Sequence, residues 1–178
     1  MVQFTKDLKR HVPYLNDKFR LRFIDRADYV AGLSKITGGL QVTRTVIEHR
    51  EGGDPTTPYK TPGPSKFDPI VLERGRTHDA DFEVWASKVW NFNGGPGAES
   101  SLADFRRDLI IDVFNEAGQK VLSWIVVGCW VSKYRAASDF DANANAVLIE
   151  QITIENEGFR RDVSVTEPQP AQFEPIVG

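Results

Sequence analysis

The segment from Asp139 to Glu150 carries the oxygen-bearing side chains that a calcium ion prefers. Its acidic and amide side chains fall at positions 1, 3, 5, 7 and 12 of a calcium-loop pattern: Asp139, Asp141, Asn143, Asn145 and Glu150. The sixth position, where such a loop turns sharply, calls for glycine but holds Ala144. The flanking sequence is typical of strands and not of helices. We therefore interpret the segment as a turn held by local side-chain-to-backbone hydrogen bonds, and we predict no metal site.

The other residues that could do chemistry are isolated from one another. Cys129 lies in the apolar run IVVGCWV, which predicts a buried, unreactive thiol. The three histidines lie in different elements and share no metal-ligand spacing: His11, His49 and His78. The GGPG run at 94–97 has no following lysine and is interpreted as the end of a helix. The sequence therefore predicts no catalytic residues and no cofactor.

Composition indicates one globular domain with no strong preference for a charged partner. The chain has 178 residues, 40% of them hydrophobic, and a net charge of −3 with its basic residues dispersed. The dispersed charge argues against a nucleic-acid-binding patch. The single cysteine excludes an internal disulfide framework, and no integral membrane segment or signal peptide is predicted. We expect the protein to be made in a cytoplasm.

Hydrophobic periodicity predicts a mainly β protein with one helix. Alternation in Lys18–Ile24 places Phe19, Leu21 and Phe23 on one face of a strand. Further strands are predicted at 39–50, 68–73, 107–115, 120–134 and 146–156, with a bulge or kink at Gly38–Gly39 and a bend or bulge at Gly128. The apolar spacing from Phe82 to Trp90 predicts a helix over about 78–92, with Thr77 as its N-cap.

One long segment between two predicted strands needs an explanation. Residues 50–67, REGGDPTTPYKTPGPSKF, hold four of the ten prolines, and we predict an extended loop that is neither helix nor regular strand. The remaining organisation is an N-terminal arm at 1–17, a domain at 18–162 that includes this loop, and a proline-rich C-terminal arm at 163–178.

The residues also resemble a known family. The motifs GLSKITGG (32–39), EHREGGDP (48–55) and LERGRTHDADFEVW (72–85) occur in the order found in tail tube proteins of contractile, T4-type phages. They are similar also to inner tube proteins of extracellular contractile injection systems. The resemblance continues through DFRRDLIIDVFNEAGQ and DANANAVLIEQITIENEGF, and it covers roughly 14–168. The local departure is ITGG where many relatives have VSG.

This resemblance implies a fold and a structural role. The fold would be two packed antiparallel sheets, barrel-like and similar to that of Hcp, in subunits that form hexameric rings. The rings would stack into a hollow tube inside a contractile sheath, which drives the tube through a target membrane. The implied partners are other copies of the chain, the sheath protein, baseplate or spike-hub proteins, tube terminators, and DNA or protein cargo. The family is not enzymatic, and its members are assembled into a virion tail or an extracellular injection particle.

We hypothesise that the long loop contacts the next ring, because it is charged and stiffened by proline. The residues expected to make this contact are Glu51, Asp54, Tyr59, Lys60 and Lys66. Alternation predicts one polar face with Lys18, Arg20 and Arg22, and other faces with Glu48, Asp108 and Asp112; one of these faces is expected to line the channel. The alternatives are a secreted Hcp-like ring, a tube-capping baseplate adaptor, and a calcium-binding β-sandwich module.

Overall fold

The alternating strands of the sequence assemble mainly into one antiparallel sheet. A computed structural model describes residues 13–50, 52–53, 58–89, 105–143 and 146–169. In these residues the strands are β1 (Phe19–Phe23), β2 (Leu33–Thr37), β3 (Val42–His49), β4 (Tyr59–Phe67), β5 (Ile70–Gly75), β6 (Arg107–Phe114), β7 (Lys120–Arg135), β8 (Ile149–Glu155) and β9 (Gly158–Arg161). The helix α1 spans Asp81–Val89. The predicted mainly β fold with one helix and antiparallel sheets is confirmed.

The long strand β7 joins the two halves of the main sheet. The strand order is β1-β6-β7-β8-β5-β2, and β9 also pairs with β7. The first half of β7 pairs with β6 and β9, whereas its last residues, from Trp130, pair with β8. Between the two regions Gly128 has a φ of +64°, which is the left-handed conformation that glycine adopts most readily. The predicted bend at Gly128 is confirmed, and it allows one strand to belong to both halves.

Period-two alternation fills one continuous core. Leu21 and Phe23 of β1 are buried as predicted, together with Leu72 of β5 and Ile152 and Ile154 of β8. The helix contributes Phe82, Trp85 and Ala86 to the same cluster. The Trp85 indole donates a hydrogen bond to the Phe105 carbonyl over 2.7 Å, and its ring packs edge-on against Phe23. The helix is therefore attached to the sheet by its apolar face and by one buried hydrogen bond.

The helix begins three residues later than predicted. The Asp81 amide donates to the Asp79 carboxylate over 2.8 Å, and the Val84 amide makes the first helical bond, to Ala80. Thr77 accepts a hydrogen bond from Asp79 instead, so it belongs to the turn before the helix and is not the N-cap. The predicted helix end at Gly94–Gly95 lies outside the described residues.

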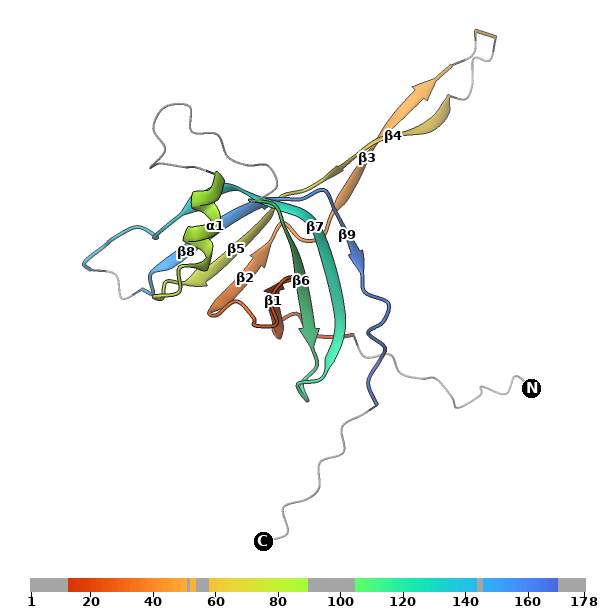
Figure 1. Cartoon of the computed structure of the whole chain (residues 1–178). Helices are drawn as coiled ribbons and strands as arrows, with labels where there is room; N and C mark the ends of the chain where they lie inside the picture. The colour runs from red at the N-terminus through yellow and green to blue at the C-terminus, as the bar shows by residue number, and fades with distance from the viewer. Residues whose placement is uncertain (1–12, 51, 54–57, 90–104, 144–145, 170–178) are drawn as a thin grey trace.

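The second half of the segment predicted as an irregular loop over 50–67 is a strand, β4. β4 pairs along its length with β3, and this two-stranded hairpin projects away from the main sheet (Figure 1). Proline lacks an amide donor, which excludes it from central strands but not from strands with a free edge. Pro62 and Pro64 are tolerated because β4 pairs on one side only. The prediction was wrong because the exclusion of proline applies to strands paired on both sides, whereas β4 pairs with β3 alone.

Candidate assembly surfaces

The β3–β4 hairpin exposes apolar side chains to solvent. Every residue of β3 is exposed, and the exposed fractions are 56% for Val46, 53% for Ile47 and 60% for Tyr59. None of these three belongs to the buried core among the described residues. Exposed apolar side chains gathered on one element commonly mark a contact surface. The hairpin therefore has the composition of an interface and not of a solvated loop.

The cross-strand register divides the predicted contact residues between the two faces of the hairpin. Lys60 lies opposite Glu48, and their charged groups are 3.5 Å apart. Tyr59 lies opposite His49 on the other face. Lys66 lies opposite Thr43, nearer the base. Glu51 and Asp54 lie outside the described residues.

The base of the hairpin is held by contacts with β9 and with Asn156, which lies between β8 and β9. The Phe67 ring lies edge-on to Phe159, with ring centroids 5.9 Å apart. The Asn156 side chain donates to the Asp68 carbonyl over 3.0 Å, and the Asp68 amide donates to the Gln41 carbonyl. These contacts direct the hairpin away from the sheet while leaving its outer residues uncovered.

A buried charge cluster attaches the start of α1 to the main sheet. Arg74 of β5 and Glu150 of β8 lie directly opposite each other, and both are fully buried. Arg74 Nε donates to Glu150 Oε2 over 2.6 Å, and its other nitrogens bond the carboxylate and carbonyl of Asp79. The second Glu150 oxygen accepts from Arg76 over 2.5 Å and from Tyr134 over 2.8 Å. Arg74 and Glu150 are thus satisfied by each other and by Arg76, Asp79 and Tyr134.

The sequence contained a signal for this cluster that we missed. Arg74 continues the alternation of Ile70 and Leu72, and Glu150 precedes Ile152 and Ile154 with the same period. A charge in phase with core residues on two strands predicts a buried pair. The same pairing argues against a calcium site at 139–150, because the Glu150 carboxylate points into the protein and is held by two arginines. Among the residues that the structure describes, no group of His, Cys, Asp or Glu side chains is arranged to hold a metal ion.

The prediction that Asp112 lies on a different face from Arg20 and Arg22 was wrong. Arg20 of β1 is directly opposite Asp112 of β6, and the Arg22 Nε lies 3.5 Å from Asp112 Oδ2. Tyr29 donates to the same oxygen over 3.0 Å. The alternation of each strand was correct, but only the pairing of β1 with β6 shows that the two polar faces coincide.

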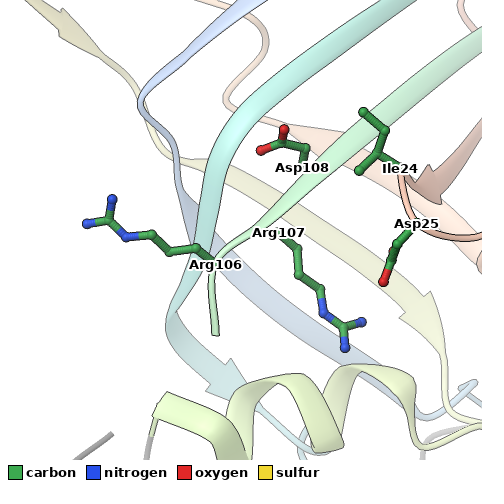
Figure 2. A pocket seen from close by; sticks show the side chains of 5 residues that line it. All are labelled: Ile24, Asp25, Arg106, Arg107 and Asp108. Carbon is green, nitrogen blue, oxygen red and sulfur yellow. The ribbon is translucent and has the colours of Figure 1, made fainter. Parts of the chain in front are cut away.

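The pocket beside β6 is lined mainly by charged side chains, three of which already contact other parts of the protein. Its lining residues are Ile24, Asp25, Arg106, Arg107 and Asp108, and its volume is about 300 Å³ (Figure 2). Arg106 points away from Arg107 and pairs with Glu157. The Arg107 guanidinium lies 4.9 Å from the centre of the Phe23 ring, and Asp108 accepts the Gly128 amide. These contacts stabilise the bend in β7 and the packing of β1.

The single cysteine lies where the sequence predicted. Cys129 is fully buried, and this burial raises the pKa of its thiol to about 12. A thiol of this pKa is protonated at neutral pH and is a poor nucleophile.

No helix in the described part of the chain is long and apolar enough to cross a membrane.

Known proteins share this fold. A family model described as T4-like virus tail tube protein gp19 matches residues 16–160. The chain is similar to one in the sheath–tube complex of an extracellular contractile injection system, PVC, in the extended state, with a TM-score of 0.67 and 19% identity over 86% of this chain and 93% of that one. It is also similar to the tube terminating cap of the anti-feeding prophage, with a TM-score of 0.70 and 21% identity over 91% of this chain and 99% of that one. No curated protein matches the chain.

The fold and the family model together define a structural subunit of a tail tube. The chain belongs to the T4-like virus tail tube protein gp19 family, whose model covers most of its length. Its role is accordingly structural and not enzymatic. The resemblance seen in the sequence motifs is confirmed.

Proposed function

We propose that this tail tube subunit forms hexameric rings that stack into a hollow tube, with the β3–β4 hairpin contacting the adjacent ring. The observation that carries the proposal is the hairpin itself, which projects from the sheet with Val46, Ile47 and Tyr59 more than half exposed. Burying such side chains against a second subunit releases free energy of about 25 cal/mol per Å² of apolar surface.

A tube needs two kinds of contact. A head-to-tail contact that closes produces a ring, and a second contact that does not close extends the ring into a filament. The end strands of the main sheet order are β1 and β2; β2 and the part of β1 that Tyr29 and Val30 leave uncovered supply edges for the first contact. Pairing these edges between subunits removes unpaired backbone groups, as closure of any barrel does. The hairpin supplies the second contact.

The assembled tube would pass through the sheath. We propose that contraction of a sheath protein drives the tube through a target membrane, and that DNA or protein cargo travels in the lumen. Baseplate and terminator proteins would contact the two ends. The proposal is supported by the similarity of this fold to a chain of a sheath–tube complex and to a tube terminating cap.

Shortening the hairpin tests the proposal. Replacing residues 47–61 by Asn-Gly leaves Val46 opposite Pro62 as the last cross-strand pair, joined by a two-residue turn. Because the removed part lies outside the core, the variant should remain folded and form rings without long tubes. Electron microscopy of the wild-type chain should show tubes of uniform width with six-fold end views. Long tubes formed by the shortened variant would contradict the role of the hairpin, and wild-type monomers at high concentration would contradict the tube itself.

A further inference from the structure

The connection between β7 and β8 forms a small depression with exposed apolar walls. Residues 138–141 and 146–148 line it, and its volume is about 120 Å³. We call these residues the acceptor surface. Phe140 is 85% exposed and Val147 is 72% exposed, so two large apolar side chains lie uncovered beside one depression.

The acceptor surface is held in place by its own hydrogen bonds. Ser138 Oγ accepts the Ile149 amide over 3.2 Å, and Arg135 donates to the Ala137 carbonyl and the Asp139 carboxylate. At the other end, the Leu148 carbonyl accepts the Arg76 amide, beside the buried charge cluster. These hydrogen bonds hold the chain at both ends of the surface that carries Phe140 and Val147.

The hairpin and the acceptor surface are complementary in charge. The acceptor surface carries two acidic side chains and no basic one: Asp141, and Asp139, which pairs with the neighbouring Arg135 while its own side chain stays 99% exposed. The described hairpin residues 42–50 and 58–67 carry the basic side chains Arg44, Arg50, Lys60 and Lys66 and one acidic side chain, Glu48. Both surfaces also expose apolar side chains, so contact between them would remove apolar area from water on each side.

The two surfaces lie on opposite sides of the subunit (Figure 1). Two such surfaces that face apart cannot meet within one chain, but a contact between them in different copies would be head to tail. We infer that the acceptor surface of one subunit binds the hairpin of a second copy of this chain, with Tyr59 against Phe140 and Val147. This inference rests on the proposed tube, and it identifies the surface that the hairpin contacts.

Cysteine crosslinking tests the contact directly. One subunit carries Tyr59→Cys, and a second, differently tagged subunit carries Phe140→Cys. Mild oxidation of mixed tubes should yield a dimer that contains both tags and disappears on reduction. The native Cys129 is buried and should remain unlinked. The matched control replaces Phe140→Cys by Glu116→Cys, an exposed position in the turn between β6 and β7, and should give no such dimer.

Charge reversal tests the complementarity. Asp139→Lys with Asp141→Lys, or Arg50→Glu with Lys66→Glu, should each lower the fraction of subunits in tubes by about tenfold, and combining both pairs should restore it. Normal tubes of the Tyr59→Cys and Phe140→Cys subunits that yield no dimer with both tags, or a Phe140→Ser variant that assembles like wild type, would overturn the inference while leaving the tube intact. An acceptor variant that forms normal tubes but loses sheath binding would also overturn it. Absence of wild-type tubes would instead reject the proposed function.

Discussion

Arg74 and Glu150 form a fully buried ion pair at the junction of β5, β8 and α1, with 2.6 Å between Arg74 Nε and Glu150 Oε2. The Arg74 guanidinium also lies 4.2 Å from the centre of the Phe82 ring. One arginine therefore contacts the neighbouring strand, the turn before the helix and the apolar face of the helix. This arrangement explains how a helix of nine residues is held in one position on the sheet.

Breaking this pair should destabilise the subunit strongly. Glu150→Ala leaves the Arg74 charge buried without its carboxylate, so we expect the free energy of unfolding to fall by about 3–5 kcal/mol. Urea unfolding followed by tryptophan fluorescence measures this change. The control is Glu157→Gln, which removes the exposed pair with Arg106 and should cost no more than about 1 kcal/mol. Equal losses from the two substitutions would show that burial of the pair does not matter.

Two adjacent glycines provide a matched test of backbone strain where the hairpin begins. Gly38 and Gly39 both have positive φ, of +88° and +62°. A Cβ at Gly38 would overlap the backbone carbonyl oxygen of Pro69, whereas a Cβ at Gly39 would meet no atom within 4 Å. We expect Gly39→Ala to cost about 1–2 kcal/mol for the left-handed conformation alone, and Gly38→Ala to cost about 3 kcal/mol or more. Thermal unfolding of the two variants side by side decides the point, and similar midpoints would contradict the predicted overlap.

The hydroxyl of Tyr134 should make stability sensitive to alkaline pH. Burial, and then the hydrogen bond to Glu150, raise the pKa of Tyr134 from 10.0 to about 12. A pKa raised by folding means that the stabilisation is fully present below about pH 10 and is lost as the pH rises towards 12. Tyr134→Phe should therefore show a smaller loss of stability than wild type between pH 10 and pH 12. Chemical unfolding at fixed pH values measures the difference, and parallel pH profiles would contradict the expectation.

Cys129 should be unreactive in the folded subunit. Its thiol is buried and its pKa is raised to about 12, so the thiolate needed for reaction is scarce at pH 8. A colorimetric disulfide reagent should label the urea-unfolded chain fully while the native chain stays unlabelled over the same time. Rapid labelling of the native chain would show that β7 opens around Gly128 far more readily than its pairing indicates.

The sequence predicted the faces of individual strands well because alternation is a local property. Leu21 and Phe23 are buried, and Gly128 bends its strand as expected. The failures concern relations between strands. The polar residues Arg20 and Asp112 were assigned to different faces, yet the pairing of β1 with β6 places them opposite each other.

The proline-rich segment at 50–67 is a second case in which the sequence did not predict how strands lie relative to one another. Its proline content correctly excluded a central strand, but it did not exclude β4, which has one unpaired edge. Whether a strand is central or projecting depends on what lies beside it, and residues 50–67 contain no information about that. The predicted contact role of Tyr59, Lys60 and Lys66 remains a proposal, now with their positions on the hairpin defined.

By itself, the sequence determined the strand periodicity, the single amphipathic helix and, through its ordered motifs, the family. The tertiary structure alone decided that Arg74 meets Glu150, that the long loop is a hairpin with both faces exposed, and that Phe140 and Val147 remain uncovered. The physical reason is the range of the interactions. Periodicity is set by neighbours a few residues apart, whereas pairing, burial and exposure depend on contacts between residues far apart in the chain.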